Sequence, residues 1–330
     1  MAEAISRPAP RQSPSRSVGC LLGSLAAALV VVLAVAAFIT FPLWMPWLSG
    51  FFSPWPESPS PTSLDLHSVA MVSATDGWAV GENGTILHYG GSQWAQANSP
   101  TGSNLLSVTM ESATEGWAVG DHGTILHYTG GQWSVVNSPT TQNLISVAMV
   151  SATDGWAVGY DPDSGNGTIL HYTRSQWTQV TTSVSNPLTS VAIVSATDGW
   201  AVGNHGTILH YVGGQWRAVT SPLPYDLLNV TMVSATNGWA VGDHQILHFT
   251  GGNWTVVQAP VNTTLFSVAM VSATEGWAVG DGQILRYSGG QWTQVSDPSS
   301  SVLASVAMVS ATDGWVVGWS GTILHYGSTT

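Results

Sequence analysis

Histidines recur at one position of an internal repeat, and histidine is the commonest metal ligand among protein side chains. They are His88, His127, His171, His210, His248 and His325, with Arg286 at the remaining occurrence. Zinc requires its nitrogen ligands at about 2.0–2.1 Å. Equivalent positions of repeats arranged in a ring point around a wide circle, so these histidines are not expected to meet at one ion. We therefore predict a packing or hydrogen-bonding role for them, and no cofactor.

A second recurring group is acidic and precedes a Gly-Trp pair. Its members are Asp76, Glu115, Asp154, Asp198, Glu275 and Asp313, with Asn237 in the fifth copy. Short acidic side chains often accept hydrogen bonds from backbone amides in turns, which predicts a structural role.

The sequence lacks the residue patterns of common enzyme sites. Arg174, Arg217 and Arg286 occupy three different repeat positions, so the arginine trio of a sialidase-like site is not expected. With no GxSxG, no P-loop and no distinct carboxylate pair, the sequence predicts a protein that is not an enzyme.

One loop is longer than its counterparts and contains oxygen ligands of the kind that calcium prefers. It spans residues 160–167, and Asp161, Asp163 and Asn166 are the candidate ligands. Their spacing departs from the D-x-D-x-[DN]-G start of the usual calcium loop. A plain turn is therefore the expected structure, and calcium binding is the weaker alternative.

Seven copies of one unit must position these residues. The tryptophans of the Gly-Trp pairs are separated by 39, 39, 44, 39, 38 and 38 residues, close to the ~40 residues of a propeller blade. Four short runs per copy, separated by Gly-rich turns, indicate strands A to D. We predict an all-β, seven-bladed propeller of four-stranded blades over residues 64–330; the shorter coils of a β-helix fit less well. The repeated tryptophans are expected to pack between blades, and they are Trp78, Trp117, Trp156, Trp200, Trp239, Trp277 and Trp315.

The seventh copy ends after strand C, and the segment before the first copy can supply its strand D. Trp55 is followed by Pro61 after six residues and by Ser68 after thirteen, the same spacing that follows Trp94. Closure by this segment would protect the edge of the last blade. The alternative is that residues 49–63 form only a linker.

The N-terminal region predicts a membrane anchor. Residues 18–40 carry no charged side chain and are long enough to cross a hydrocarbon core of ~30 Å. Trp44 and Trp47 belong to an aromatic flank typical of the interface. The basic tail, residues 1–17, favours a cytoplasmic N-terminus. We expect a single-pass cell-membrane protein with anchor 18–48 and an extracytoplasmic propeller; a cleaved signal peptide, usually with a shorter apolar region, is the alternative.

The copies differ most in the turns between strands B and C. If the chain enters the ring beside the A–B and C–D turns, that face is toward the membrane, and the B–C turns face outward. Loops on a rigid scaffold commonly bind partners, although drift in exposed turns is the alternative. The candidate binding residues are Glu82, Asp121, His122, Tyr160, Asp161, Asp163, Asn166, His205, Asp243, His244, Asp281 and Trp319.

The charge of the propeller narrows the class of partner. After residue 17 the chain has three arginines, no lysine and 17 acidic residues, a net charge of −14 with histidine neutral. Nucleic-acid binding depends on cations that contact phosphates, so this class is disfavoured. An acidic outward face predicts a partner with a basic surface and binding that weakens with salt.

The stretch 77–89, GWAVGENGTILHY, and its near copies resemble the propellers of the photosystem II stability/assembly factor family. Those propellers are seven-bladed and related to the Asp-box repeats of sialidases. The resemblance covers residues 64–326 and implies a non-enzymatic assembly or docking role beside a membrane complex. The family usually has an Asp-Gly-Gly turn before the outer tryptophan. Here residues 130–133 read Gly-Gly-Gln-Trp without the Asp, and the family's basic patch is not matched.

Three functions follow as hypotheses. The first is a membrane-tethered scaffold that docks a protein or the exposed part of a membrane complex. The second is a propeller that binds or cleaves surface glycans, for which Tyr160 and Trp319 are the only aromatic residues in the B–C turns. The third is a spacer or assembly element.

Overall fold

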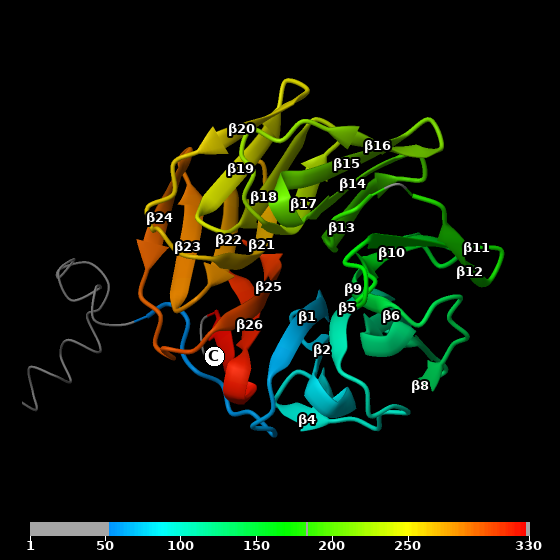
Figure 1. Cartoon of the computed structure of the whole chain (residues 1–330). Coiled ribbons are helices and arrows are strands. Elements are labelled where there is room, and N and C mark those ends of the chain that lie inside the picture. The colour runs from blue at the N-terminus through cyan, green and yellow to red at the C-terminus, as the bar shows by residue number, and fades with distance from the viewer. Residues whose placement is uncertain (1–52, 183, 328–330) are drawn as a thin grey trace, which may run out of the picture. The chain divides into compact units, whose positions relative to one another are not determined.

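The computed structural model describes residues 53–182 and 184–327, which form seven antiparallel sheets (Figure 1). Blade one contains β1 (Leu66–Ser73), β2 (Asp76–Gly81), η2 (Glu82–Gly84), β3 (Ile86–Tyr89) and β4 (Trp94–Gln96). Blade two contains β5 (Leu105–Ser112), β6 (Glu115–Gly120), η3 (Asp121–Gly123), β7 (Ile125–Thr129) and β8 (Gln132–Val135). Blade three contains β9 (Asn143–Ser151), β10 (Asp154–Tyr160), β11 (Gly167–Thr173) and β12 (Gln176–Val180).

Blade four contains β13 (Leu188–Ser195), β14 (Asp198–Gly203), η4 (Asn204–Gly206), β15 (Thr207–Val212) and β16 (Gln215–Val219). Blade five contains β17 (Leu227–Ser234), β18 (Asn237–Gly242), β19 (Gln245–Thr250) and β20 (Asn253–Val257). Blade six contains β21 (Leu265–Ser272), β22 (Glu275–Gly280), β23 (Gln283–Ser288) and β24 (Gln291–Val295). Blade seven contains β25 (Leu303–Ser310), β26 (Asp313–Gly318), η5 (Trp319–Gly321) and β27 (Ile323–Tyr326). The η elements are short 3-10 turns, and the predicted seven-bladed propeller is confirmed.

Strand A of each blade contacts strand A of the next, so the seven A strands surround the centre of the ring (Figure 1). Side chains of strand B alternate between the two neighbouring blades, as the period of two in a strand requires. In β2, Trp78 and Val80 pack against blade two, whereas Ala79 packs against blade seven. Strand B is therefore buried on both faces, which explains its continuous apolar sequence.

A ring of hydrogen bonds joins the A strands. The hydroxyl of Ser68 in blade one accepts from the backbone N–H of Val108 in blade two, at 3.2 Å. The same bond recurs at every interface, with Asn229 in place of serine in blade five. The seventh bond runs from the N–H of Val69 to Ser305 and closes the circle at 3.2 Å. The remaining four bonds join Val147 to Ser107, Val191 to Ser146, Val230 to Ser190, and Val306 to Ser267.

The repeated tryptophans fill the space between blades, as the sequence analysis expects. Trp78 of blade one lies against Tyr128 and Trp133 of blade two, with ring centroids 4.7 and 5.5 Å apart. Corresponding aromatic groups occur at all seven interfaces. The hydrophobic core therefore consists of seven clusters, each formed by residues of two neighbouring blades, in place of the single core of an ordinary domain.

The N-terminal segment completes blade seven. Glu57 forms an antiparallel bridge with Leu324. The N–H of His325 donates to Pro56 O at 3.0 Å, and that of Ser58 donates to Ile323 O at 2.8 Å. Trp55 has no exposed surface and meets Trp277 edge to face, with centroids 5.1 Å apart. It thus occupies the place that Trp133 takes beside Trp78.

The first described residue lies at the outer rim of the ring. The hydroxyl of Ser53 donates to the carbonyl of Ser296, at 2.6 Å, just beyond the end of β24. Trp55 lies beside Tyr326 as Trp94 lies beside Tyr89 in blade one, and Glu57 pairs with Leu324 as Gln96 pairs with Leu87. The chain therefore enters the outer strand of blade seven at its C–D end, as the sequence analysis expects. Chain entry alone does not assign either face to the membrane.

The tail 1–17 and the anchor 18–48 lie outside the described residues. Within residues 53–182 and 184–327 there is no helix with the length and apolar character that a membrane crossing requires. The anchor therefore stays a prediction from the sequence.

Candidate functional site

Five of the six recurring histidines are held by the acidic residue of their own blade, and His248 is paired with Asn237 instead. In blade one, His88 Nε2 lies 2.8 Å from Asp76 Oδ1, and the imidazole stacks on Trp78 with centroids 4.3 Å apart. Similar acid–histidine–tryptophan groups occur in blades two, three, four and seven. Each group lies within a single blade and engages Nε2 of its histidine.

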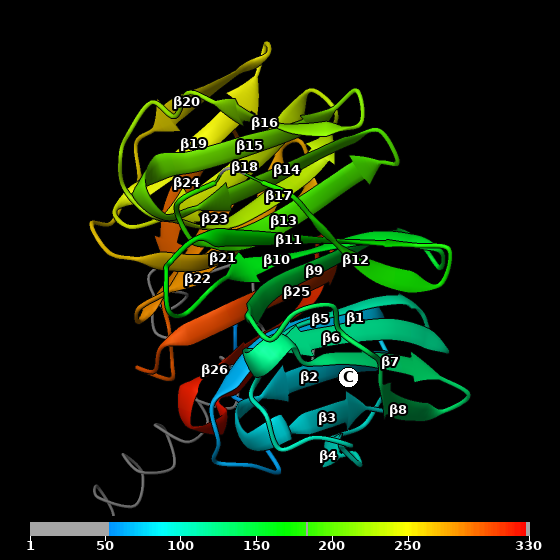
Figure 2. The same cartoon turned by 45° about the vertical axis from the view of Figure 1, so that its right-hand side comes forward.

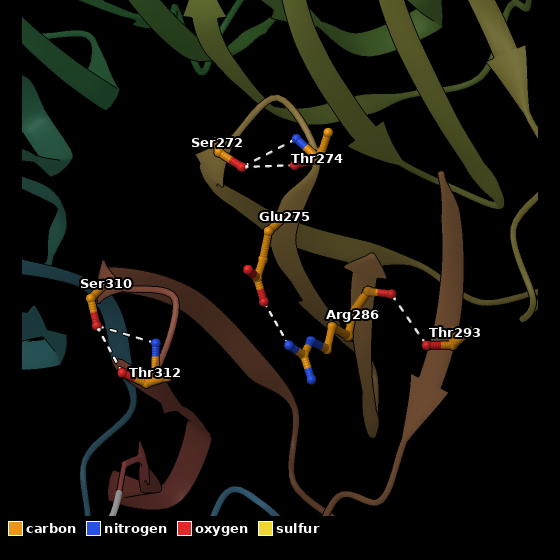
Figure 3. Close-up of polar contacts among 7 residues, drawn as sticks. All are labelled: Ser272, Thr274, Glu275, Arg286, Thr293, Ser310 and Thr312. Carbon is orange, nitrogen blue, oxygen red and sulfur yellow. Dashed lines mark hydrogen bonds and ion pairs between the residues drawn. The ribbon is translucent and has the colours of Figure 1, made fainter. Parts of the chain in front are cut away.

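The expectation that the acids bind backbone amides in the A–B turns is wrong. Serine does so instead: Ser272 Oγ accepts from the N–H of Thr274 at 3.2 Å (Figure 3). Glu275 is thereby free to accept from Arg286 Nη2 at 2.6 Å, and that guanidinium lies 5.4 Å from the ring centre of Trp277. Arg286 therefore replaces a histidine in the same arrangement. The recurrence of an acid before Gly-Trp and of a histidine in strand C, 12 residues apart in blades one, two, four and seven, was the sequence signal for this pairing.

The B–C turns are held by hydrogen bonds to the next blade. His122 lies in the left-handed region at φ 55°, and its N–H donates to Asn143 Oδ1 at 3.0 Å. His205 has the same φ, and its N–H donates to Asp226 Oδ1 at 2.7 Å. Asn83 and Ser320 are bonded in the same way by residues of the following blade. The turns therefore present their side chains from a fixed backbone.

The structure places the candidate binding residues on this face, which we call the B–C face, but does not gather them at one point. The side chains of His122, His205 and His244 are exposed, one on each of three blades. Asp121 and Asp243 are partly occupied, because each accepts a hydrogen bond from Asn104 or Thr264. The other candidates on this face are Glu82, Tyr160, Asp163, Asn166, Asp281 and Trp319.

The long loop of blade three uses Asp161 for its own structure. Asp161 Oδ1 accepts from the N–H of Asp163 at 3.0 Å, and Oδ2 accepts from Ser164 Oγ at 2.9 Å. These hydrogen bonds stabilise the ionised form and lower the pKa of Asp161. The arrangement is that of an Asx turn, and its carboxylate is directed to the loop itself.

A pocket of about 290 Å³ occupies the centre of the B–C face. It is lined by one residue near the start of every A strand, the third residue of β9 and the second of the other six, where the pairing of strands A and B contains an irregularity in register. A bulge of this kind redirects a side chain from the sheet. The seven residues, which with Trp319 we call the channel mouth, are His67, Leu106, Ile145, Thr189, Leu228, Phe266 and Ala304.

The channel mouth includes one residue from the candidate set and adjoins two more. Trp319 is 47% exposed and lies in η5, which contacts β1. Burial lowers the pKa of His67, and the charges of Asp65, Glu82 and Asp121 act in the opposite direction with smaller effect. The sequence did not predict the other lining residues, because the prediction considered only the turns. The signal that could have found them is the variation of one position inside strand A between the copies.

A larger groove of about 540 Å³ lies at the junction of blades three and four. Trp216 lines it and is half-buried, whereas the outer tryptophans of the other blades are at most 7% exposed. Hydroxyl and amide side chains, including Thr182, Asn186 and Gln215, make up much of the remaining lining. None of the lining residues is acidic, lysine or arginine.

Glu111 is a buried acid that the recurring pattern does not explain. Valine occupies this position in the other blades. Both carboxylate oxygens of Glu111 lack exposed surface and a hydrogen-bond partner. Burial, followed by the nearby charge of Glu115, raises the pKa of Glu111.

Comparisons with protein families and with characterised proteins find no match by sequence. Among solved structures, the chain is similar to "YCF48 bound to D1 peptide", with TM-score 0.69, 19% identity, and coverage of 84% of this chain and 96% of that one. It is also similar to YCF48 from Cyanidioschyzon merolae, with TM-score 0.66, 18% identity, and coverage of 83% and 98%. A third likeness is to the WD40 β-propeller domain of Doa1, with TM-score 0.70, 14% identity, and coverage of 84% and 98%. These likenesses establish the fold.

Proposed function

We propose that this chain is a membrane-tethered, extracytoplasmic propeller that acts as a non-catalytic docking or assembly scaffold. Its partner binds at the B–C face. The observation that carries the proposal is the hydrogen bonding between the turns of blades one, two, four and seven and the residues that begin the next blade, as in the bond from His122 N–H to Asn143. A fixed backbone that presents different side chains in each blade is suited to recognition, because little ordering entropy is lost on binding.

The charge distribution supports a basic partner. The three arginines of the described residues lie elsewhere, in the turn after β11 and in strands β16 and β23. The B–C face instead carries Glu82, Asp121, Asp243 and Asp281. Complementary charge accelerates association and makes it dependent on salt. One of the similar propellers is a complex with a D1 peptide, which accords with a polypeptide partner.

The non-catalytic assignment rests on where the ionisable groups lie. The acid–histidine pairs are distributed one to a blade, and within residues 53–182 and 184–327 no three His, Cys, Asp or Glu side chains form a metal site. Placement at the membrane rests on residues 18–48 of the sequence. The resemblance to photosystem II assembly factors accords with both.

Affinity capture of the full chain from native membranes in mild detergent tests the proposal. A variant with His122, His205 and His244 changed to Asn alters the exposed side chains but suits a backbone at φ 55°. The matched control changes Val233 and Val271 to Thr, which are exposed at the ends of β17 and β21. We expect one membrane complex with the native chain and the control, and its loss with the histidine variant. Equal recovery with all three would reject docking at this face.

The groove between blades three and four favours glycan binding as a second candidate. A half-buried indole beside uncharged hydroxyl and amide groups suits a neutral sugar ring, which stacks on an aromatic face and exchanges hydrogen bonds. Binding of a panel of neutral oligosaccharides, measured by tryptophan fluorescence, should be lost in Trp216→Ala and kept in the histidine variant. A panel without any response would remove this candidate.

A further inference from the structure

The channel mouth is built by a repeated device. Each A strand carries an irregularity in register near its start, at the residue that lines the pocket, so seven side chains that would otherwise belong to a sheet point into the centre. Five of these side chains are apolar: Leu106, Ile145, Leu228, Phe266 and Ala304. The surrounding Leu, Ser/Asn and Val of each A strand recur almost unchanged. Sequence variation inside strand A is thus concentrated at the position that reaches the pocket.

Acidic side chains lie beside the apolar pocket on one sector. Asp65 Oδ1 accepts a hydrogen bond from the N–H of Ser320, next to Trp319, at 2.7 Å, and the carbonyl oxygen of Asp65 accepts from the N–H of Glu82 at 2.9 Å. Each B–C turn lies over the next blade: η2, with Glu82, contacts β5, and η5, with Trp319, contacts β1. The acids and the exposed indole therefore border the same part of the mouth, around blades seven, one and two.

The size of the pocket limits what enters it. A space of about 290 Å³ is near the lower end of ligand sites, which span ~300–1,000 Å³. A folded domain can therefore insert only one bulky side chain. A cation beside that side chain would meet the acidic sector and the face of Trp319, which favours positive charge.

We propose that the channel mouth binds a short extended segment of the partner, in which one large apolar side chain enters the pocket and an adjacent Arg or Lys contacts the acidic sector. This inference deepens the docking function and rests on it. The binding determinant is then a linear motif, an apolar residue beside a basic one, rather than a broad folded surface.

Fluorescence anisotropy with labelled peptides tests the motif on the full chain in mild detergent. The probe is Gly-Ser-Arg-Phe-Arg-Ser-Gly, and its two controls replace Phe with Ser or both Arg with Glu. We expect saturable binding of the probe and at least tenfold weaker binding of each control. Equal binding of the probe and the Ser control would overturn the proposal, since the pocket would then contribute nothing.

Two variants locate the interaction. Ala304→Trp fills the pocket and should abolish probe binding. Leu228→Arg places a cation in the pocket and should do the same, which protects the test if the first variant folds poorly. Glu82→Gln should weaken binding and reduce its salt dependence, and Val233→Thr should change neither. Unaltered binding by folded Ala304→Trp or Leu228→Arg would refute the site.

Capture from membranes separates this inference from the proposed function. If the native chain and Ala304→Trp recover the same complex, docking stands and the motif at the channel mouth is wrong. If the native chain recovers no specific complex but the probe binds and Ala304→Trp does not, the mouth stands as a peptide site and the assembly role is wrong.

Discussion

The hydroxyl of Ser305 in the last blade accepts a hydrogen bond from the backbone N–H of Val69 in the first blade, at 3.2 Å. These residues are far apart in sequence but join β25 to β1, which lie side by side in both views (Figures 1 and 2). The bond completes the circle of seven, so blade seven is joined to blade one by the same contact that joins every other pair of neighbouring blades. Closure at the rim is separate and depends on Trp55.

Ser305→Ala should lower the free energy of unfolding by about 1–2 kcal/mol, because the partly buried N–H of Val69 loses its acceptor. Ser305→Asn is the matched control, since Asn229 Oδ1 performs this role at 3.0 Å in blade five. Urea unfolding of the full chain in detergent, followed by tryptophan fluorescence, measures both. Equal losses in the two variants would show that the hydrogen bond is not the cause.

Trp55→Ala should destabilise the ring by about 3–5 kcal/mol, the usual cost of removing a buried large aromatic side chain. The change empties the contact with Trp277 and loosens the segment that covers the edge of β27. Glu57→Ala is the control, because its side chain is exposed and its bridge to Leu324 uses only backbone atoms. Limited proteolysis should cut blade seven sooner in the first variant only. Comparable resistance would reject closure by this segment.

Arg286→Ala should cost on the order of 1 kcal/mol, because the ion pair with Glu275 is partly exposed and such pairs contribute little. Arg286→His should restore most of that stability, since a glutamate and a histidine form the same pair in blade two, between Glu115 and His127. Thermal unfolding of the two variants is the measurement. A histidine variant no better than alanine would contradict the equivalence of the two arrangements.

Glu111→Val should stabilise the protein at pH 7 by on the order of 1 kcal/mol, because an unpartnered buried carboxylate is removed. Burial raises the pKa of Glu111 above its ordinary 4.5, so the folded state holds the proton more tightly than the unfolded state. The native chain therefore loses stability as pH rises from about 4.5 through the folded pKa.

The advantage of Glu111→Val is expected to shrink below pH 4, where both states of the native chain are protonated. Glu111→Gln removes only the charge and should recover the pH-dependent part. Unfolding curves at pH 4 and pH 7 measure this difference. An advantage that is the same at both pH values would mean that ionisation of Glu111 is not responsible.

The regular features of this fold were accessible from the sequence because they recur. The spacing of the Gly-Trp pairs predicted the blades, and the spacing after Trp55 predicted a segment that the structure pairs with β27. A glycine recurs near the end of every strand B, and Gly81 shows the reason. A Cβ at this position would lie 2.0 Å from the carbonyl oxygen of Asp65, in the connection that leads into strand A. Constraints of this kind repeat in every blade and leave a visible pattern.

The site was less accessible because it depends on contacts between blades. That Asp76 binds His88 rather than its own turn was not recognised, although Arg286 opposite Glu275 and His248 opposite Asn237 vary together. The irregularity at His67 comes from strand pairing, which no local motif reveals. The left-handed turn at His122 likewise depends on Asn143 of the next blade. The sequence predicted that the B–C turns share one face of the ring, but it did not predict their hydrogen-bond partners or the pocket between them.

Site-specific photo-cross-linking in native membranes tests the central claim most directly. A photoreactive residue at position 281 replaces an exposed aspartate of the B–C face, and one at position 233 replaces an exposed valine at the end of β17. We expect position 281 to give one discrete adduct that weakens as salt is raised, and position 233 to give none. An adduct from position 233 alone, or none from either position, would contradict a docking scaffold that binds through its B–C face.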